Sequence, residues 1–146
     1  MRPFSFGQWA RDIASNPDGP HLSVEEALAQ LNATRANTLS SPRNDPYMCG
    51  NVPNLPAYGP DAVECINYLA GLGNTLCEVH GFSLFCKRPH AEIVGVTGNA
   101  GYDFSTCQHV AQFAGGIMDR CYHDDHVQGL AYVTDNMAIT IDGVQS

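Results

Sequence analysis

The stretch CEVHGFSLFC, residues 77–86, places two cysteines symmetrically about a Gly81-Phe82 pair. Glycine at the first central position of a two-residue turn supplies the positive φ that a type II′ hairpin needs. With the turn there, Cys77 and Cys86 face each other at a non-hydrogen-bonded position, where Cα atoms lie about 4.5 Å apart. This separation suits a disulfide, so the stretch predicts a hairpin closed by a Cys77–Cys86 bridge. A turn at His80-Gly81 is the alternative register, and it would separate the two cysteines.

The other four cysteines are expected to form two further bridges. The chain holds six cysteines and no C-x₂-C pair, the spacing typical of zinc knuckles and thiol redox motifs. An even number of cysteines fits a disulfide framework made in an oxidising compartment. Cys107 and Cys121 share a predicted helix, where they would be about 21 Å apart and unable to pair. Two pairings stay open: Cys49–Cys107 with Cys65–Cys121, or Cys49–Cys121 with Cys65–Cys107.

Periodic apolar residues predict three helices, over residues 22–37, 60–73 and 103–121. Ser23 and Glu26 form a capping box at the start of the first.

The second and third predicted helices carry their own boundary signals. Pro60 suits the first position of a helix, and Gly71 or Gly73 is expected to end it. Ser105 and Gln108 have the spacing of a capping box for the third helix.

Strands are predicted at about residues 75–80, 83–87, 91–97, 129–134 and 137–142. Asp135-Asn136 is a plausible tight turn between the last two. In the final strand the alternation predicts three inward residues, Met137, Ile139 and Ile141, and two outward residues, Thr140 and Asp142. This element order indicates the α+β class: an antiparallel sheet of about five strands with two or three helices packed on one face.

The chain is expected to form one domain over residues 22–146, preceded by an N-terminal arm over residues 1–21. Aromatic residues of the arm, Phe4, Phe6 and Trp9, are expected to dock it on the core. Five prolines between residues 40 and 60 predict a long loop, held down through Cys49.

Charge and hydropathy restrict the partners. The net charge is −8 and Lys87 is the single lysine, so we expect no binding to nucleic acid, which requires many basic residues. No apolar run is long enough for a transmembrane helix, and no membrane insertion is expected.

The first residues lack the apolar run of a signal peptide. Since the cysteines indicate export, we expect a secreted protein whose signal peptide has been removed. Asn32 opens an N-glycosylation motif.

The densest polar cluster is CYHDDHVQG, residues 121–129. His123, Asp124 and His126 are the candidates for a metal site, and the fold would have to supply a third ligand such as His109, His90 or Glu92. The chain holds no nucleophile elbow, HExxH motif or phosphate loop. We therefore expect no catalysis and no cofactor.

Five segments carry a resemblance to a known group of proteins: DAVECINYLAGLGNTLCEV, FC, AEIVGVTG, STCQHVAQFAGGIMDRC and VQGLAYVTDNMAITIDG. In their order and spacing, over residues 60–143, they resemble the small secreted cysteine-rich proteins of filamentous ascomycetes. That group includes effectors and elicitors of plant immunity, and more distantly killer-toxin-like proteins. The resemblance implies export by a fungus, a disulfide-bonded α+β body and action by binding outside the cell.

Three functions follow as hypotheses. The first is a secreted effector or elicitor, a monomer that binds a host protein or cell-surface component. The second is an antimicrobial or killer-type toxin directed at competing microbes. The third is a small secreted hydrolase or metal-dependent enzyme that uses the His123–His126 segment.

Overall fold

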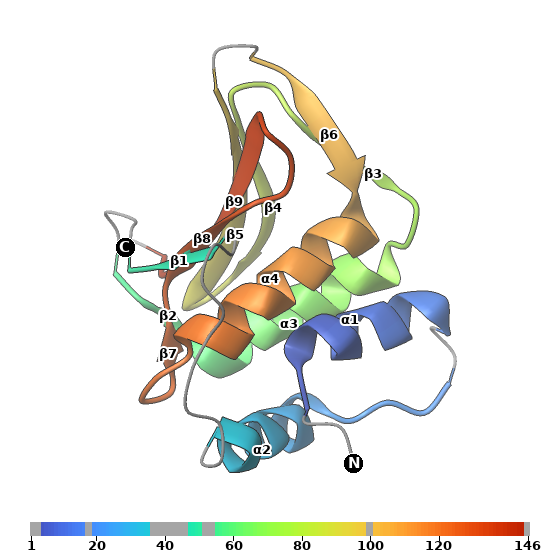
Figure 1. Ribbon diagram of the computed structural model, residues 1–146, viewed down its shortest axis with the longest axis vertical. Helices are drawn as coiled ribbons and strands as arrows, with labels where there is room; N and C mark the ends of the chain where they lie inside the picture. The colour runs from blue at the N-terminus through green and yellow to red at the C-terminus, as the bar shows by residue number, and fades with distance from the viewer. Residues whose placement is uncertain (1–3, 17–18, 36–46, 51–54, 99–100, 145–146) are drawn as a thin grey trace.

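The computed structural model describes residues 4–16, 19–35, 47–50, 55–98 and 101–144. Its main element is a five-stranded antiparallel sheet in the order β1-β8-β9-β5-β4. Helices α3 and α4 lie directly on one face of this sheet, α1 packs on them from outside, and α2 lies near one end (Figure 1). The predicted α+β class is confirmed, with four helices among the described residues.

The helices are α1 (Phe6–Ser15), α2 (Val24–Arg35), α3 (Gly59–Gly71) and α4 (Cys107–Cys121). The strands of the five-stranded sheet are β1 (Tyr47–Cys49), β4 (Phe82–Arg88), β5 (Ala91–Thr97), β8 (Gly129–Tyr132) and β9 (Met137–Asp142). Two separate two-stranded ribbons are formed by β2 (Ala57–Tyr58) with β7 (His126–Val127), and by β3 (Leu76–Val79) with β6 (Asp103–Thr106).

The hairpin predicted for residues 77–86 does not form. Gly81 has the expected positive φ of 83°, but the chain passes there from one layer of the protein to the other. β3 pairs with β6, and β4 pairs with β5. The reason is burial: Val79 of β3 is fully buried and packs so closely over β5 that a Cβ on Gly95 would lie 2.7 Å from its Cγ2. The β3–β6 ribbon thus covers one end of the sheet, beside the helices (Figure 1).

The disulfide pairing follows this topology and corrects the predicted one. Its three bridges are Cys49–Cys121, Cys65–Cys86 and Cys77–Cys107. The Cys77–Cys86 bridge was therefore a wrong prediction, because the two strands that carry these cysteines lie in different layers. Cys49–Cys121 is half of one predicted alternative, and its other half, Cys65–Cys107, is not formed. Each bridge joins a strand to α3 or to one end of α4.

Within the segment predicted as an N-terminal arm, residues Phe6–Ser15 form helix α1. The Ser5 hydroxyl caps α1 by accepting a hydrogen bond from the Gln8 amide at 3.1 Å. Phe6 and Trp9 are buried, so the predicted docking of aromatic residues is confirmed. Asp119 of α4 accepts hydrogen bonds from the amides of Phe6, at 2.6 Å, and of Gly7, at 3.2 Å. A carboxylate at this end complements the positive pole of α1.

Helix boundaries agree in part with the sequence signals. The Ser23–Glu26 capping box is present, with reciprocal hydrogen bonds of 2.9 and 3.1 Å. α3 ends at Gly71, as predicted. The predicted capping box of the third helix is wrong: Thr106 is the N-cap of α4, and Ser105 belongs to β6, because the last strand residue runs straight into the helix.

The last strand, β9, is the centre of the sheet. Met137, Ile139 and Ile141 point toward the helices as predicted. Thr140 and Asp142 alternate with them, yet both are buried, with exposed fractions of 8% and 2%. A central strand is flanked on both sides, so short side chains on either face are shielded by longer neighbours.

The proline-rich region contains two short strands, Tyr47–Cys49 and Ala57–Tyr58, so the prediction of a continuous loop from 40 to 60 fails at these residues. Pro42, Pro46 and Pro53 lie outside the described residues.

Candidate functional site

The segment singled out as a metal candidate is a tight turn. His123 and His126 exchange backbone hydrogen bonds of 2.7 and 2.9 Å. Between them Asp124 and Asp125 have φ values of 52° and 67°. Positive φ at both central positions is the signature of a type I′ turn, in which Asp is one of the favoured residues. The HDDH sequence is therefore explained by backbone geometry.

The side chains of this turn point to separate partners. His123 Nε2 lies 3.0 Å from Asp124 Oδ2, and both side chains are more than 80% exposed. The His126 ring contacts the Asp124 carbonyl, at 2.8 Å, and the Tyr58 ring. Asp125 accepts a hydrogen bond from the Tyr122 hydroxyl at 3.1 Å. Burial, followed by this bond and the Asp125 charge, raises the pKa of Tyr122.

The proposed third ligands do not join this turn. The His109 ring bonds Ser105 Oγ at 2.9 Å, at the other end of α4. Glu92 lies on β5 next to Asp142 in the sheet register. His90 comes nearest, since it lines a cavity of about 490 Å³ together with His126 and Tyr58. Across the described ranges, no three His, Cys, Asp or Glu side chains are arranged to hold a metal ion.

The second face of the five-stranded sheet carries mostly apolar side chains. The register places two rows across it, on the side away from the helices. We call this the outer sheet face: Met48, Leu130, Thr140, Val94 and Leu84 in one row, and Tyr132, Ala138, Val96 and Phe82 in the other. Phe82 is 64% exposed and Leu84 50%. Met48 and Tyr132 are exposed as well, whereas Val94, Ala138 and Thr140 in the middle of the face are buried. Exposed apolar side chains gathered on one face are typical of an interaction site.

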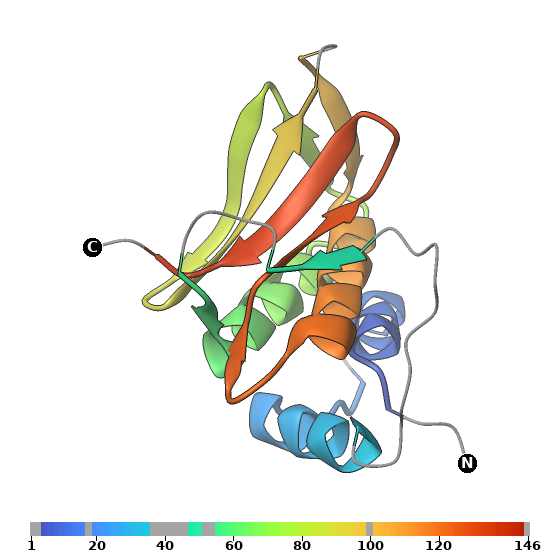
Figure 2. The same cartoon turned by 60° about the vertical axis from the view of Figure 1, so that its left-hand side comes forward.

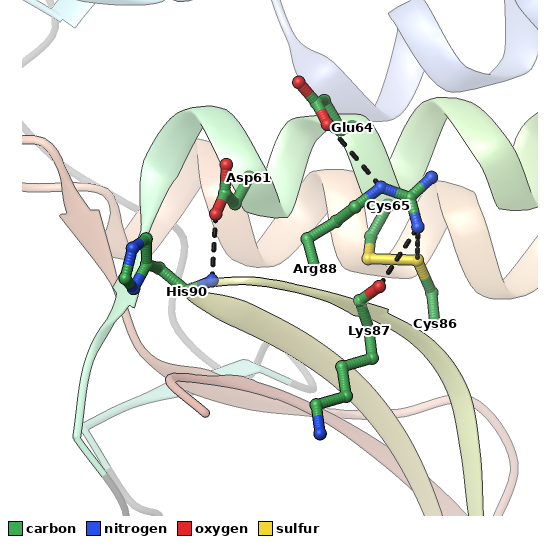
Figure 3. Close-up of a disulfide and its surroundings, with 7 residues drawn as sticks. All are labelled: Asp61, Glu64, Cys65, Cys86, Lys87, Arg88 and His90. Atoms are coloured by element: carbon green, nitrogen blue, oxygen red, sulfur yellow. Dashed lines mark hydrogen bonds and ion pairs between the residues drawn. A yellow bond between two sulfur atoms is a disulfide. The ribbon is translucent and has the colours of Figure 1, made fainter. Parts of the chain in front are cut away.

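A disulfide fixes the edge of the outer sheet face. Cys86 of the edge strand β4 is bonded to Cys65 of α3 (Figure 3). Arg88 reinforces this link, with its Nη1 3.4 Å from the Cys86 sulfur and its Nε 3.5 Å from Glu64 Oε1. Together with Lys87, the charged arginine also protects the edge from pairing with other strands.

A smaller surface lies on the β3–β6 ribbon. Its buried side contains Cys77 and Val79, and its exposed side forms what we call the ribbon surface: Leu76, Glu78, His80, Tyr102 and Phe104. The ring centroids of His80 and Tyr102 are 4.7 Å apart, and those of Tyr102 and Phe104 are 6.1 Å apart. The three rings thus form a continuous exposed row.

A carboxylate lies within this row. The Tyr102 hydroxyl donates a hydrogen bond to Glu78 Oε1 at 3.1 Å. Desolvation raises the pKa of Tyr102, and the Glu78 hydrogen bond, the Glu78 charge and the Asp103 charge raise it further.

Sequence reasoning missed both surfaces. The alternation of Glu78 with Val79 and of Phe104 with Ser105 was visible, and it marks one exposed side of each strand. The pairing of β3 with β6, which brings these residues together, was not.

No helix in the described part of the chain is long and apolar enough to cross a bilayer. Three disulfides are typical of secreted or extracellular proteins.

No curated protein matches the chain. Residues 44–143 match a family described as a domain of unknown function, DUF8794. The match includes all six cysteines and every strand found among the described residues, and leaves out α1 and α2. Since it spans more than half of the sequence, the chain belongs to the DUF8794 family.

Proposed function

We propose that this protein is a secreted effector or elicitor that acts outside the cell by binding a component of host plant tissue. The observation that carries the proposal is the outer sheet face, which is lined by side chains from all five strands. Four of its apolar side chains are exposed: Met48, Tyr132, Leu84 and Phe82. The helices of the described residues lie on the opposite face (Figure 2). A partner that removed the side chains of Phe82 and Leu84 from water, where they are at least 50% exposed, would gain free energy from their burial.

The disulfides support action outside the cell. They connect β1, β4 and β3 to α3 and α4. A scaffold held in this way presents its surface residues with little loss of conformational entropy on binding. The metal-dependent alternative has weaker support, because the turn at His123–His126 directs its side chains to separate partners.

The test is infiltration of leaves with the oxidised protein. We expect cell death, an oxidative burst or defence gene expression, and loss of the response after reduction and alkylation of the protein. The variant that addresses the outer sheet face is Phe82→Ser with Leu84→Ser. The matched control is Tyr68→Ser, which removes an aromatic ring that is 47% exposed on α3.

The proposal predicts that Phe82→Ser with Leu84→Ser abolishes the response while Tyr68→Ser retains it. A native protein that elicits no response would overturn it. Growth inhibition of rival fungi by the same native protein would instead favour the toxin alternative.

A further inference from the structure

We propose that the ribbon surface binds a cationic side chain, arginine in particular, of an extracellular partner. The inference rests on the proposed function and names the chemistry of one contact. The inference is based on three exposed rings, those of His80, Tyr102 and Phe104, that lie beside the Glu78 carboxylate on one rigid ribbon.

The rings are accessible to solvent in part. Tyr102 is 41% exposed and Phe104 48%. Neighbouring rings are tilted by 41° for His80 and Tyr102 and by 37° for Tyr102 and Phe104. The face of an aromatic ring carries a partial negative charge, so a guanidinium or ammonium group over Tyr or Phe is attracted to it.

Glu78 adds a formal negative charge at the centre of the row. It lies directly opposite Phe104 in the ribbon register and accepts the Tyr102 hydroxyl through Oε1. An ionised carboxylate has acceptor sites for about four hydrogen bonds, so Glu78 can take further donors from a ligand. A planar guanidinium matches this arrangement, because it can stack on a ring and bond a carboxylate at the same time.

The ribbon is held in place before any ligand arrives. Cys77 is bonded to Cys107 at the start of α4. Asp103 Oδ2 accepts the Thr134 hydroxyl at 2.5 Å, which joins β6 to the loop between β8 and β9. Rings and carboxylate therefore lose little freedom on binding, which favours affinity.

Charge complementarity selects a cation over a neutral or anionic partner. The chain carries a net charge of −8, and long-range attraction therefore favours basic ligands. The protein uses the same contact internally, with Arg120 4.0 Å from the centre of the Tyr47 ring and Arg88 5.7 Å from that of Tyr68. These two arginine–tyrosine contacts, the ones found among the described residues, leave the rings of the ribbon surface accessible.

The experiment titrates the oxidised protein with an acetylated, amidated tetra-arginine peptide while recording amide NMR spectra at low salt. We expect saturable shifts confined to β3, β6 and the residues around His80 and Tyr102. The tetra-citrulline peptide has the same shape without the charge, and we expect it to bind at least about ten-fold more weakly.

Variants localise the contact. We expect Tyr102→Leu to weaken tetra-arginine binding about five-fold and Glu78→Gln about ten-fold. The matched control is Glu25→Gln on α2, an exposed carboxylate away from the ribbon, for which affinity should stay within about two-fold. If Tyr102→Leu proves unstable in a thermal melt, Phe104→Leu replaces it, since it removes another ring of the row and should likewise weaken tetra-arginine binding.

Three outcomes would overturn the inference: no saturable shift on the ribbon up to millimolar peptide, equal losses for Glu25→Gln and Glu78→Gln, or equal binding of the citrulline peptide. Binding of cello- or chito-oligosaccharides to these rings in preference to arginine would assign the surface to a glycan and also reject it. If the leaf response persists in native protein while the ribbon fails these tests, the proposed function stands and this inference alone falls.

Discussion

Cys86 of β4 is bonded to Cys65 of α3, with Cα atoms 5.7 Å apart, although the symmetric stretch of residues 77–86 places Cys77 closer to it in sequence. The bond fastens the edge of the five-stranded sheet to the helix layer. Its neighbour Arg88 contacts both the Cys86 sulfur and Glu64 of α3 (Figure 3). The edge strand that carries Phe82 and Leu84 is thus fixed covalently at its opposite end.

Disulfide mapping tests this pairing directly. Proteolysis under non-reducing conditions and mass spectrometry should yield three linked peptide pairs and no free thiol: Cys49–Cys121, Cys65–Cys86 and Cys77–Cys107. We expect the double variant Cys65→Ser with Cys86→Ser to lower the free energy of unfolding by about 3 kcal/mol, measured in urea. A peptide that contains Cys77 linked to Cys86 would contradict the layer arrangement.

Gly115 is predicted to be intolerant of a side chain. A Cβ there would lie 2.5 Å from the Phe6 carbonyl oxygen, where α1 crosses α4. Gly115→Ala should therefore separate the two helices and lower the free energy of unfolding by about 1–3 kcal/mol, despite the better helix propensity of alanine. Gly71→Ala is the control, because no atom lies within 4 Å of a Cβ at that position. Equal thermal stability of the two variants would show that α1 does not pack as described.

Glu92 makes stability depend on pH. Burial raises the pKa of this carboxyl, the Asp142 charge raises it further, and Lys87 lowers it in part. The folded state therefore holds the proton more tightly than the unfolded chain, and this contribution to stability is lost as the pH rises through the raised pKa. Glu92→Gln should increase the free energy of unfolding at neutral pH by about 0.5 kcal/mol, a small value because water screens the site.

Below about pH 3 the Glu92 carboxyl is protonated in both the folded and the unfolded protein, so the parent protein and Glu92→Gln should have the same stability. Lys87→Gln provides a control of opposite sign, since it removes a favourable charge from Glu92 and should destabilise the protein at neutral pH. Denaturant unfolding at several pH values measures both effects. A stability gain from Glu92→Gln that persists in acid would rule out a charge effect.

The backbone of the HDDH turn predicts which substitutions Asp124 accepts. With φ at 52°, a β-branched residue is strained there, and Asp124→Val should cost about 1–2 kcal/mol in thermal or denaturant unfolding. Asp124→Gly should be neutral or slightly stabilising, because glycine adopts positive φ without strain. The reverse order of stability would mean that the turn is not of type I′.

The features predicted correctly depend on neighbours in sequence. The Ser23–Glu26 capping box joins residues three apart, and Gly81 has a positive φ whichever strand follows it. The end of α3 at Gly71 and the strand at Met137–Asp142 also follow from local patterns. By contrast, the features that were missed join residues far apart in sequence. The disulfide that fixes the ribbon joins Cys77 to Cys107, 30 residues apart. The hydrogen bond within the ribbon surface joins Tyr102 to Glu78, 24 residues apart.

The sequence by itself determined an acidic α+β domain with six cysteines, the starts and ends of several helices, and a turn after His80. The tertiary structure decided which strands pair, and with them the disulfide partners and both exposed surfaces. The physical reason is that a turn or a helix cap is stabilised by a few adjacent groups. The choice of β6 as partner of β3 depends on burying Cys77 and Val79 against α4 and β5, a gain that exists only when the whole core is assembled.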